Sequence, residues 1–273
     1  MQLSTPLFRT TLAFLKPIRC KINLWDGKTV SIVGHNGQII NLGAGFDTLY
    51  WILKDAGFEV SNFVELDFPG VTSKKIHAIC KEGSPMYRSV CADKNMPAQD
   101  VQHVDLHGDR YHLVGVDLRN TKEVRSKLIE CGIAQDRPTL ILSECVLVYM
   151  TSDQSNKLLT MLAIMFNNAV FINYEQINID DQFGTIMQEH LLNRGIAMTG
   201  VTACHSVESQ ISRFLDCGWG HAYAWSMKDI YRRLPKDELQ RIEALEFLDE
   251  VELLDQLLEH YCISIGIKET GSL

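Results

Sequence analysis

The chain has 273 residues, of which 46% are hydrophobic and 22% are charged, a balance typical of a soluble globular protein. Its net charge of −8, from 26 Lys and Arg against 34 Asp and Glu, argues against a protein that binds nucleic acid or an anionic membrane through its overall charge. The length is ample for one large α/β domain. We therefore expect no nucleic-acid partner and no membrane association.

The amino-terminal residues do not predict a secretory signal, because Arg9, Lys16 and Arg19 interrupt the only apolar stretch there. The most apolar internal run, residues 139–150, is far shorter than a membrane span. The eight cysteines are scattered, with no Cys-x-x-Cys pair, which is typical of reduced thiols in a reducing compartment. We expect a cytoplasmic monomer.

From residue 38 onward, short apolar runs alternate with helical periods. Residues 38–42 predict a strand, and the glycines of residues 43–45 predict a turn after it. Asp47 is placed to cap the next helix, and Gly57 is placed to end it. A second strand is predicted at residues 60–66.

Pro69 suits the first turn of the helix that follows the second strand. Residues 83–109 are polar with little periodicity, and we interpret them as an excursion over the surface. The pattern then resumes with strands predicted at 111–116, 139–143 and 169–174 and helices at 121–131 and 151–165.

The carboxy-terminal third adds helices predicted at 181–193, 206–217 and 235–260 and strands at 220–225 and 261–268. Strands that alternate with helices indicate βαβ units. The sequence therefore predicts a doubly wound, seven-stranded, mostly parallel sheet of the Rossmann-like α/β class. We expect a short amino-terminal segment, residues 1–37, followed by one domain, residues 38–273.

The turn Asn41-Leu-Gly-Ala-Gly-Phe-Asp47 joins the first strand to the first helix. Glycines let a backbone approach a ligand closely, and a helix N-terminus favours a carboxylate or phosphate. A dinucleotide fingerprint requires a third glycine where Thr48 stands, which argues against a nicotinamide enzyme. A tight turn with a purely structural role is the alternative interpretation.

Acidic residues end the next three strands. Asp67 lies 24 residues after Gly43, where a carboxylate can accept both hydroxyls of an adenosine ribose. Asp117 ends the third strand, where it could read an adenine edge, and Glu144 ends the fourth. Asp67 and Asp117 could instead cap helices, and Glu144 could be a paired buried charge. Together, polar groups at one edge of such a sheet favour a ligand site.

His103, His107 and His112 form the only group of histidines with ligand-like spacing. They lie in a polar segment, and no cysteine joins them in the sequence. We therefore expect no metal site.

Six motifs together resemble the leucine carboxyl methyltransferase family, over residues 39–268. They are Gly43-Ala-Gly45, Phe63-Val-Glu-Leu-Asp-Phe-Pro69, Gly115-Val-Asp-Leu-Arg119, Ser143-Glu-Cys-Val-Leu-Val-Tyr-Met150, Phe171-Ile-Asn-Tyr-Glu175 and Leu245-Glu-Phe-Leu-Asp-Glu250. The resemblance implies an enzyme dependent on S-adenosylmethionine. By the same resemblance, its substrate is the C-terminal leucine carboxylate of the catalytic subunit of protein phosphatase 2A, which is then the expected partner.

The resemblance also implies the cofactor-binding residues. Gly43 would line the methionine end of S-adenosylmethionine, and Asp67 would bind its ribose. Asp117 and Leu118 would contact the adenine, and Glu144 would hold the methionine ammonium group. A carboxylate substrate is already an anion at neutral pH, so we look for no general base and assign no catalytic residue.

Two other hypotheses for the function remain. Only residues 1–37 precede the first strand, and the family usually has a longer helical lead-in that closes over the cofactor. The chain could thus be a catalytically impaired form that binds the cofactor or the phosphatase. It could also be a related methyltransferase acting on tRNA or a small carboxylic acid, although the acidic charge weighs against tRNA.

The acidic stretch 235–260 is interpreted as a helix face exposed to solvent or, alternatively, as a helix face that contacts a partner.

Overall fold

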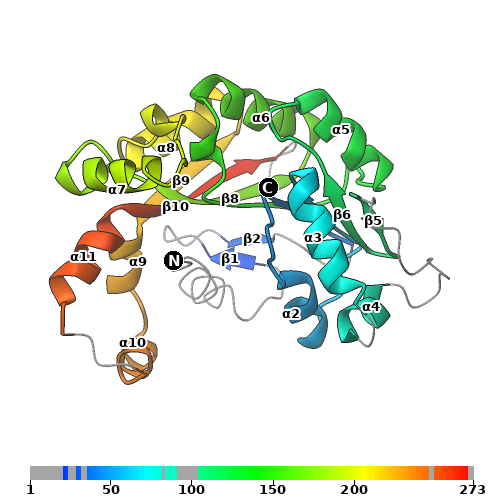
Figure 1. The fold of residues 1–273 in the computed structure, drawn as a ribbon, viewed down its shortest axis with the longest axis horizontal. Coiled ribbons are helices and arrows are strands. Elements are labelled where there is room, and N and C mark those ends of the chain that lie inside the picture. The colour runs from blue at the N-terminus through cyan, green and yellow to red at the C-terminus, as the bar shows by residue number, and fades with distance from the viewer. Residues whose placement is uncertain are drawn as a thin grey trace. The chain divides into compact units, whose positions relative to one another are not determined.

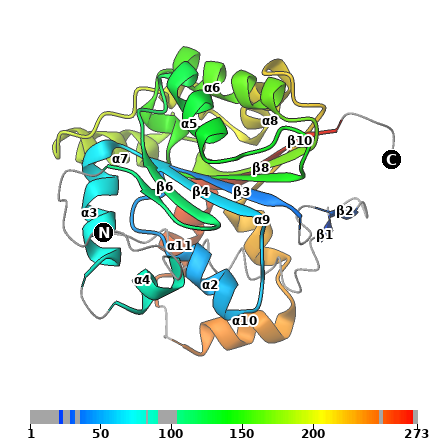
Figure 2. The same cartoon turned by 90° about the vertical axis from the view of Figure 1, so that its right-hand side faces the viewer.

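The computed structural model describes residues 21–23, 29–31, 36–81, 84–90, 104–245 and 249–269 (Figures 1 and 2). By its contacts the chain divides into two compact units. Unit 1 comprises Met1–Glu144, Thr160–Phe171 and Ile267–Leu273, and unit 2 comprises Cys145–Leu159 and Ile172–Gly266. The predicted boundary between residues 37 and 38 stays a prediction.

In the part of the chain that the structure describes, the main sheet has eight strands, in the order β5-β6-β4-β3-β7-β8-β10-β9. They are β3 (Gln38–Leu42), β4 (Asn62–Asp67), β5 (Leu106–His107), β6 (Tyr111–Gly115), β7 (Thr139–Glu144), β8 (Ala169–Gln176), β9 (His221–Ser226) and β10 (Tyr261–Lys268). Strand β3 pairs in parallel with β4 and β7, and β4 pairs in parallel with β6. The chain thus builds the sheet outward from β3 in both directions, and the predicted doubly wound α/β class is confirmed.

The sheet of unit 1 is buried on both faces. Ile39 and Ile40 of β3, and Phe63 and Val64 of β4, point to opposite faces and are all buried, as expected for parallel strands that are covered by helices. The helices of this unit are α2 (Leu49–Asp55), α3 (Pro69–Ile79), α4 (Pro85–Val90) and α5 (Thr121–Glu130). Figure 2 shows α3 beside β6 and β4, the strands that it contacts.

Local sequence explains the ends of several helices of unit 1. Pro69 stands in the first turn of α3, and the Asn120 side chain caps α5 by accepting from the Glu123 N–H group. Gly57 follows α2 at a φ of +79°, as predicted for a residue that ends a helix. Ahead of the main sheet, β1 (Lys21–Asn23) and β2 (Thr29–Ser31) pair antiparallel in a separate two-stranded sheet.

Unit 2 is richer in helix. Its elements, besides those strands of the main sheet that fall within it, are η1 (Leu147–Tyr149), the start of α6 (Ser152–Met165), α7 (Gln182–Leu192), η2 (Val201–Ala203), α8 (Val207–Asp216), α9 (Met227–Arg232), α10 (Lys236–Glu243) and α11 (Val251–Glu259). Ser206 and Ser209 form a capping box at the start of α8. Phe214 on this helix is fully buried and contacts Trp219 edge-on.

Two sequence predictions of secondary structure are wrong. The described residues form a main sheet of eight strands, not seven, because β5 joins its edge antiparallel to β6. A strand of only two residues shows no alternation of apolar and polar residues that could reveal it.

The predicted single helix at 235–260 is also wrong, because α10 ends at Glu243 and α11 begins at Val251. Its apolar residues recur every three positions, from Leu239 to Val251. At 3.6 residues per turn, each step of three falls about 60° short of a full turn, so the stripe drifts around the axis. One long helix could not have buried them all, and Leu245 between the two helices is 73% exposed.

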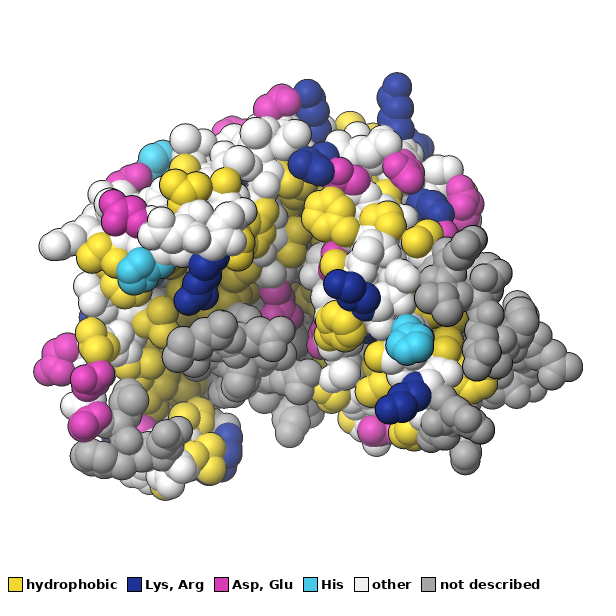
Figure 3. Space-filling view, in the orientation of Figure 1, with side chains coloured by type: hydrophobic (Ala, Val, Ile, Leu, Met, Phe, Trp, Pro, Cys, Tyr) yellow, Lys and Arg dark blue, Asp and Glu magenta, His cyan; other side chains and the backbone are white. Residues whose placement is uncertain are grey.

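No helix among the described residues is both long and apolar enough to span a bilayer. On the face shown in Figure 3, the described Lys and Arg side chains are scattered among acidic and apolar ones. That face therefore lacks a continuous basic patch of described side chains.

Candidate functional site

The register of unit 1 brings the predicted site residues to one edge of the sheet. Leu42 pairs with Leu66 on one side and with Ser143 on the other. The residues that follow these three are Gly43, Asp67 and Glu144. Because the strands are parallel, all three lie at the carboxyl edge of the sheet and at the same level.

The backbone N–H groups of the glycine turn are already hydrogen-bonded within the chain. Gly43 and Ala44 donate to the Leu66 carbonyl at 2.7 and 3.2 Å. The N–H groups of Thr48 and Leu49 donate to Oδ1 of Asp47, at 2.6 and 3.2 Å. These N–H groups are therefore not available to a ligand, and Asp47 occupies the position that a phosphate would take at the start of α2.

This finding corrects one sequence expectation and refines another. The N-terminus of α2 is not open to an anionic ligand, because a carboxylate of the chain already satisfies it. Asp47 does accept from the first N–H groups, although the helix begins at Leu49 and Thr48 is the N-cap residue. Gly45 adopts a φ of +52°, and a Cβ atom there would meet nothing within 4 Å, so the turn faces open space.

Asp67 lies against this turn. Its Oδ2 accepts from the Gly45 N–H group at 2.7 Å, and its Oδ1 accepts from the Phe68 N–H group at 2.6 Å. The Asp67 carbonyl accepts from Val116 N–H at 2.7 Å, which joins the ends of β4 and β6. An ionised carboxylate has about four acceptor positions, so two remain for hydroxyl groups of a ligand.

Asp117 follows β6 and forms an ion pair with Arg119. The Arg119 Nη2 atom lies 2.6 Å from Asp117 Oδ2, and Nε lies 2.8 Å from Oδ1. The Arg119 side chain holds the pKa of Asp117 below its usual range. The Arg119 guanidinium also lies 5.7 Å from the centre of the Phe68 ring. Leu118, which lies between Asp117 and Arg119 in the sequence, is buried. Asp117 is thus fixed in the charged form.

Glu144 is the last residue of β7 and is partly buried. The next residue, Cys145, has a φ of +52°, which is rare for a residue with a side chain. Strained backbone of this kind clusters at functional sites, where the surrounding structure maintains it. Here it ends β7 directly after the predicted ligand of the ammonium group.

The chemistry of this edge selects among ligands. Asp67, Asp117 and Glu144 are all acidic, and the turn beside them offers few free N–H donors. A pyrophosphate would meet like charge here, whereas hydroxyl and ammonium groups would meet acceptors. The residues therefore fit S-adenosylmethionine, which carries ribose hydroxyls and an ammonium group, better than they fit a dinucleotide.

Sequence reasoning missed a buried ionic network beneath this edge. Glu65 accepts from Lys75 Nζ at 2.5 Å and from the Tyr111 hydroxyl at 2.7 Å, and Glu65 is fully buried. Burial raises the pKa of Glu65 to about 7, and Lys75 opposes that rise. A signal was present, because Lys75 shares the buried face of α3 with Thr72 and Ile79 at helical spacing.

The histidine group differs from the expectation. His107 and His112 are register partners across β5 and β6, with their Nδ1 atoms 3.0 Å apart. Cys131, at the end of α5, joins them, with the ligand atoms of all three within 4.8 Å of one another. The expectation that no cysteine joins this group is therefore wrong, while His103 lies outside the described residues.

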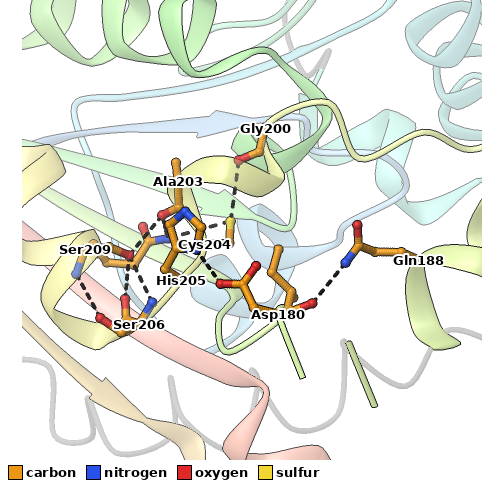
Figure 4. Close-up of polar contacts among 10 residues, drawn as sticks. Asp180, Gln188, Gly200, Ala203, Cys204, His205, Ser206 and Ser209 are labelled. Carbon is orange, nitrogen blue, oxygen red and sulfur yellow. Dashed lines mark hydrogen bonds and ion pairs between the residues drawn. The ribbon is translucent and has the colours of Figure 1, made fainter. Parts of the chain in front are cut away.

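Unit 2 contains a second polar cluster, in which residues of η2 and the start of α8 lie beside Asp180 (Figure 4). His205 pairs with Asp180, and Cys204 donates from its thiol to the Gly200 carbonyl. Burial raises the pKa of Cys204 to about 12, so its thiol is not an activated nucleophile. Ser206 and Ser209 are occupied in the capping box, and the cluster therefore has a structural role.

Comparison with known proteins identifies close relatives. The family model for leucine carboxyl methyltransferase matches residues 18–163. Leucine carboxyl methyltransferase 1 of Bos taurus is 44% identical over 241 residues, which cover 87% of this chain and 71% of that protein. The tRNA wybutosine-synthesizing protein 4 of Rattus norvegicus is 36% identical over 230 residues, which cover 83% of this chain and 33% of that protein.

Solved structures share the fold at low identity. A structure of a putative methyltransferase from Thermobifida fusca matches with a TM-score of 0.53 and 13% identity, over 86% of this chain and 74% of that chain. The S-adenosylmethionine-dependent methyltransferase SibL matches with a TM-score of 0.51 and 11% identity, and this chain covers 55% of its length. These matches show that the chain shares a Rossmann-like fold with these two proteins.

Proposed function

Because the chain belongs to the leucine carboxyl methyltransferase family, we propose that it transfers a methyl group from S-adenosylmethionine to the carboxylate of a C-terminal leucine, forming a methyl ester. The proposed substrate is the catalytic subunit of protein phosphatase 2A. The observation that carries the proposal is the acidic carboxyl edge of unit 1, where Gly43, Asp67 and Glu144 lie at one level.

Each site residue has a role that its surroundings support. Asp67 is held against the glycine turn by two backbone N–H groups, and its remaining acceptor positions suit the ribose hydroxyls. Asp117 and the buried Leu118 offer a charged acceptor and an apolar surface to the adenine. Glu144 suits the ammonium group, since a partly buried carboxylate is best satisfied by a cation.

The proposed reaction needs no general base from the protein. S-adenosylmethionine supplies an electrophilic methyl group when it is bound. A terminal carboxyl group has an ordinary pKa of about 3.3–3.7, so the substrate oxygen is a nucleophile at neutral pH without losing a further proton. The chain's own contribution is to position the two reactants and to exclude water.

A labelling experiment tests the reaction and the substrate together. The chain is incubated with methyl-labelled S-adenosylmethionine and the phosphatase subunit, with and without its terminal leucine. We expect label only on the intact subunit, and we expect mild base to release it, because a methyl ester hydrolyses where an N-methyl group does not. Label that is stable to base, or that persists without the leucine, contradicts the proposal.

The second candidate is a methyltransferase acting on tRNA, which the wybutosine-synthesizing relative favours. That protein is three times as long as the region it shares with this chain. A parallel incubation with tRNA in place of the phosphatase subunit decides between the two, since label on tRNA favours this second candidate.

The assignment of Glu144 has its own test. We expect Glu144→Ala to abolish methyl transfer through lost cofactor affinity, because removing one member of a charge pair costs about 2 kcal/mol or more, or about 30-fold in Kd. Binding of S-adenosylhomocysteine is measured by calorimetry. The matched control is Asp136→Ala, an exposed acid of the same unit, which should bind normally. Unchanged binding by Glu144→Ala removes this residue from the site.

A further inference from the structure

His107, His112 and Cys131 form a compact group in unit 1, at a place where the proposed reaction uses no residue. The two imidazoles face each other across the β5–β6 pair, which Figure 1 shows at one edge of the sheet. Cys131 reaches the same point from the end of α5 and is 3% exposed. Three different elements thus direct one nitrogen or sulfur atom each toward a common centre.

We propose that these three side chains bind a zinc ion. Two imidazole nitrogens and one thiolate are the donors that zinc prefers, whereas magnesium and calcium prefer oxygen. In a tetrahedral zinc site the donor atoms lie about 3.3–3.6 Å apart, as Zn–N and Zn–S bond lengths require. The Nδ1 atoms are already 3.0 Å apart, and all three donors lie within 4.8 Å of one another.

Small movements close the remaining gap. His107 is exposed and His112 is partly buried, so their rings can rotate without displacing the core. Water completes the fourth position, on the exposed side of His107. The Cys131 thiol releases its proton to solvent when the Zn–S bond forms, because zinc binds the thiolate.

The position of the group gives it a structural role. His112 stands near the start of β6, and Asp117 of the cofactor site follows the end of that strand. Asp117 lies five positions after His112, or about 16 Å along an extended chain. The zinc ion therefore lies toward the opposite edge of the sheet from the proposed cofactor, where it ties the β5–β6 pair to α5.

Asp105, which directly precedes β5, already connects β5 to β6 and α5 without a metal. Its Oδ1 accepts from Gly115 N–H at 2.8 Å, and its Oδ2 lies 2.5 Å from Lys127 Nζ on α5. The zinc group repeats this connection at the other end of β6.

Cobalt is the probe for this site, because Co²⁺ replaces Zn²⁺ and reports its ligands by absorption. The full chain, freed of metal with a chelator, is titrated with Co²⁺ and then with Zn²⁺. We expect one equivalent to bind, with a thiolate-to-cobalt charge-transfer band and the visible spectrum of a four-coordinate ion, both lost when Zn²⁺ displaces it. Zinc should also raise the Tm of the chain, and the shift should grow with zinc concentration.

Variants identify the ligands. Cys131→Ser should remove the charge-transfer band, and His107→Ala should weaken binding by more than the roughly 10–100-fold typical of an outer-shell partner. The matched controls are His77→Ala and Cys80→Ser in α3, since Cys80 also ends a helix of unit 1. His107 is exposed, so its loss leaves the fold intact even if Cys131→Ser does not fold.

The contrary outcomes are equally definite. No stoichiometric Co²⁺ binding by the wild-type chain, binding without a thiolate band, or a thiolate band that survives Cys131→Ser would overturn the proposal. Binding of S-adenosylhomocysteine is measured in parallel, and His107→Ala should leave it unchanged. A loss of that binding would contradict the purely structural role of the zinc ion.

Discussion

Glu65 in unit 1 and Glu175 in unit 2 are both fully buried acids on strands of the main sheet. Burial raises the pKa of each to about 7, and a buried cation opposes the rise in both cases. The two differ in how the cation is placed. Glu65 accepts directly from Lys75 at 2.5 Å and from Tyr111 at 2.7 Å.

Glu175 accepts instead from the backbone N–H group of Val148 at 3.0 Å. Arg213, its cation, donates to Ser155 at 2.5 Å and to Asn156 at 3.3 Å. Among the described residues, one carboxylate oxygen of each acid, Glu65 Oε1 and Glu175 Oε1, is buried without a hydrogen-bond partner, but in unit 2 the Nη1 atom of the cation Arg213 is unpartnered as well. Glu65 and Glu175 thus reach a similar pKa in different ways. Glu65 has a direct ion pair with Lys75, whereas Glu175 has a backbone hydrogen bond and a more remote cation, Arg213. Stability should therefore depend on the cation more strongly in unit 1.

The largest effect is expected from Lys75→Met. Removing one partner of a buried ion pair leaves a buried charge uncompensated, which costs about 3–5 kcal/mol. Urea unfolding at pH 8, where Glu65 is ionised, measures the loss. The control is Lys74→Met, the exposed neighbour on the same helix. A loss no greater than that of the control would show that Glu65 does not need the cation.

A double variant sharpens this result. Glu65→Gln combined with Lys75→Met removes both charges, so it should recover part of the stability that Lys75→Met loses. Contacting residues show coupling of about 0.5–3 kcal/mol, and we expect the upper half of that range here. Additive effects of the two changes would contradict a direct pair.

A smaller effect is expected from Arg213→Met in unit 2. This change removes hydrogen bonds to Ser155 and Asn156, which costs about 1–3 kcal/mol, but it breaks no direct contact with Glu175. The exposed Arg194 supplies the control variant. If Arg213→Met destabilises the chain more than Lys75→Met does, the proposed difference between the units is wrong.

Per buried acid and per pH unit, the smallest expected effect is the dependence of stability on pH. Because the folded-state pKa of Glu65 and Glu175 is about 7 and the ordinary value is 4.5, the folded chain retains protons that the unfolded chain releases between these values. The free energy of unfolding should therefore fall as pH rises through this window, by at most about 1.4 kcal/mol per pH unit for each group.

Unfolding curves at pH 5, 6, 7 and 8 measure this slope. Glu65→Gln and Glu175→Gln should each flatten it, whereas Glu59→Gln, an exposed acid, should not. Equal slopes in all four proteins would mean that neither buried acid changes its protonation on folding in this range.

Much of the fold followed from local patterns in the sequence. The seven predicted strands and the helices capped by Asn120, Asp181 and Ser206 appear within a few residues of their expected bounds. Alternating elements with a glycine turn after the first strand imply a doubly wound sheet. Such a sheet gathers the strand ends at one edge, so the positions of Gly43, Asp67, Asp117 and Glu144 could be expected from their order alone.

Other features depend on contacts between segments that are distant in sequence. Nothing near Glu65 in the chain indicates that Lys75 and Tyr111 converge on it, and nothing near His112 indicates Cys131. The N–H groups of the glycine turn are satisfied only once Leu66 and Asp67 lie beside them. The sequence by itself determined the elements and their order, because periodicity and capping are local. Only the tertiary structure decided which buried charges meet and which donors remain for a ligand, because those depend on packing across the sheet.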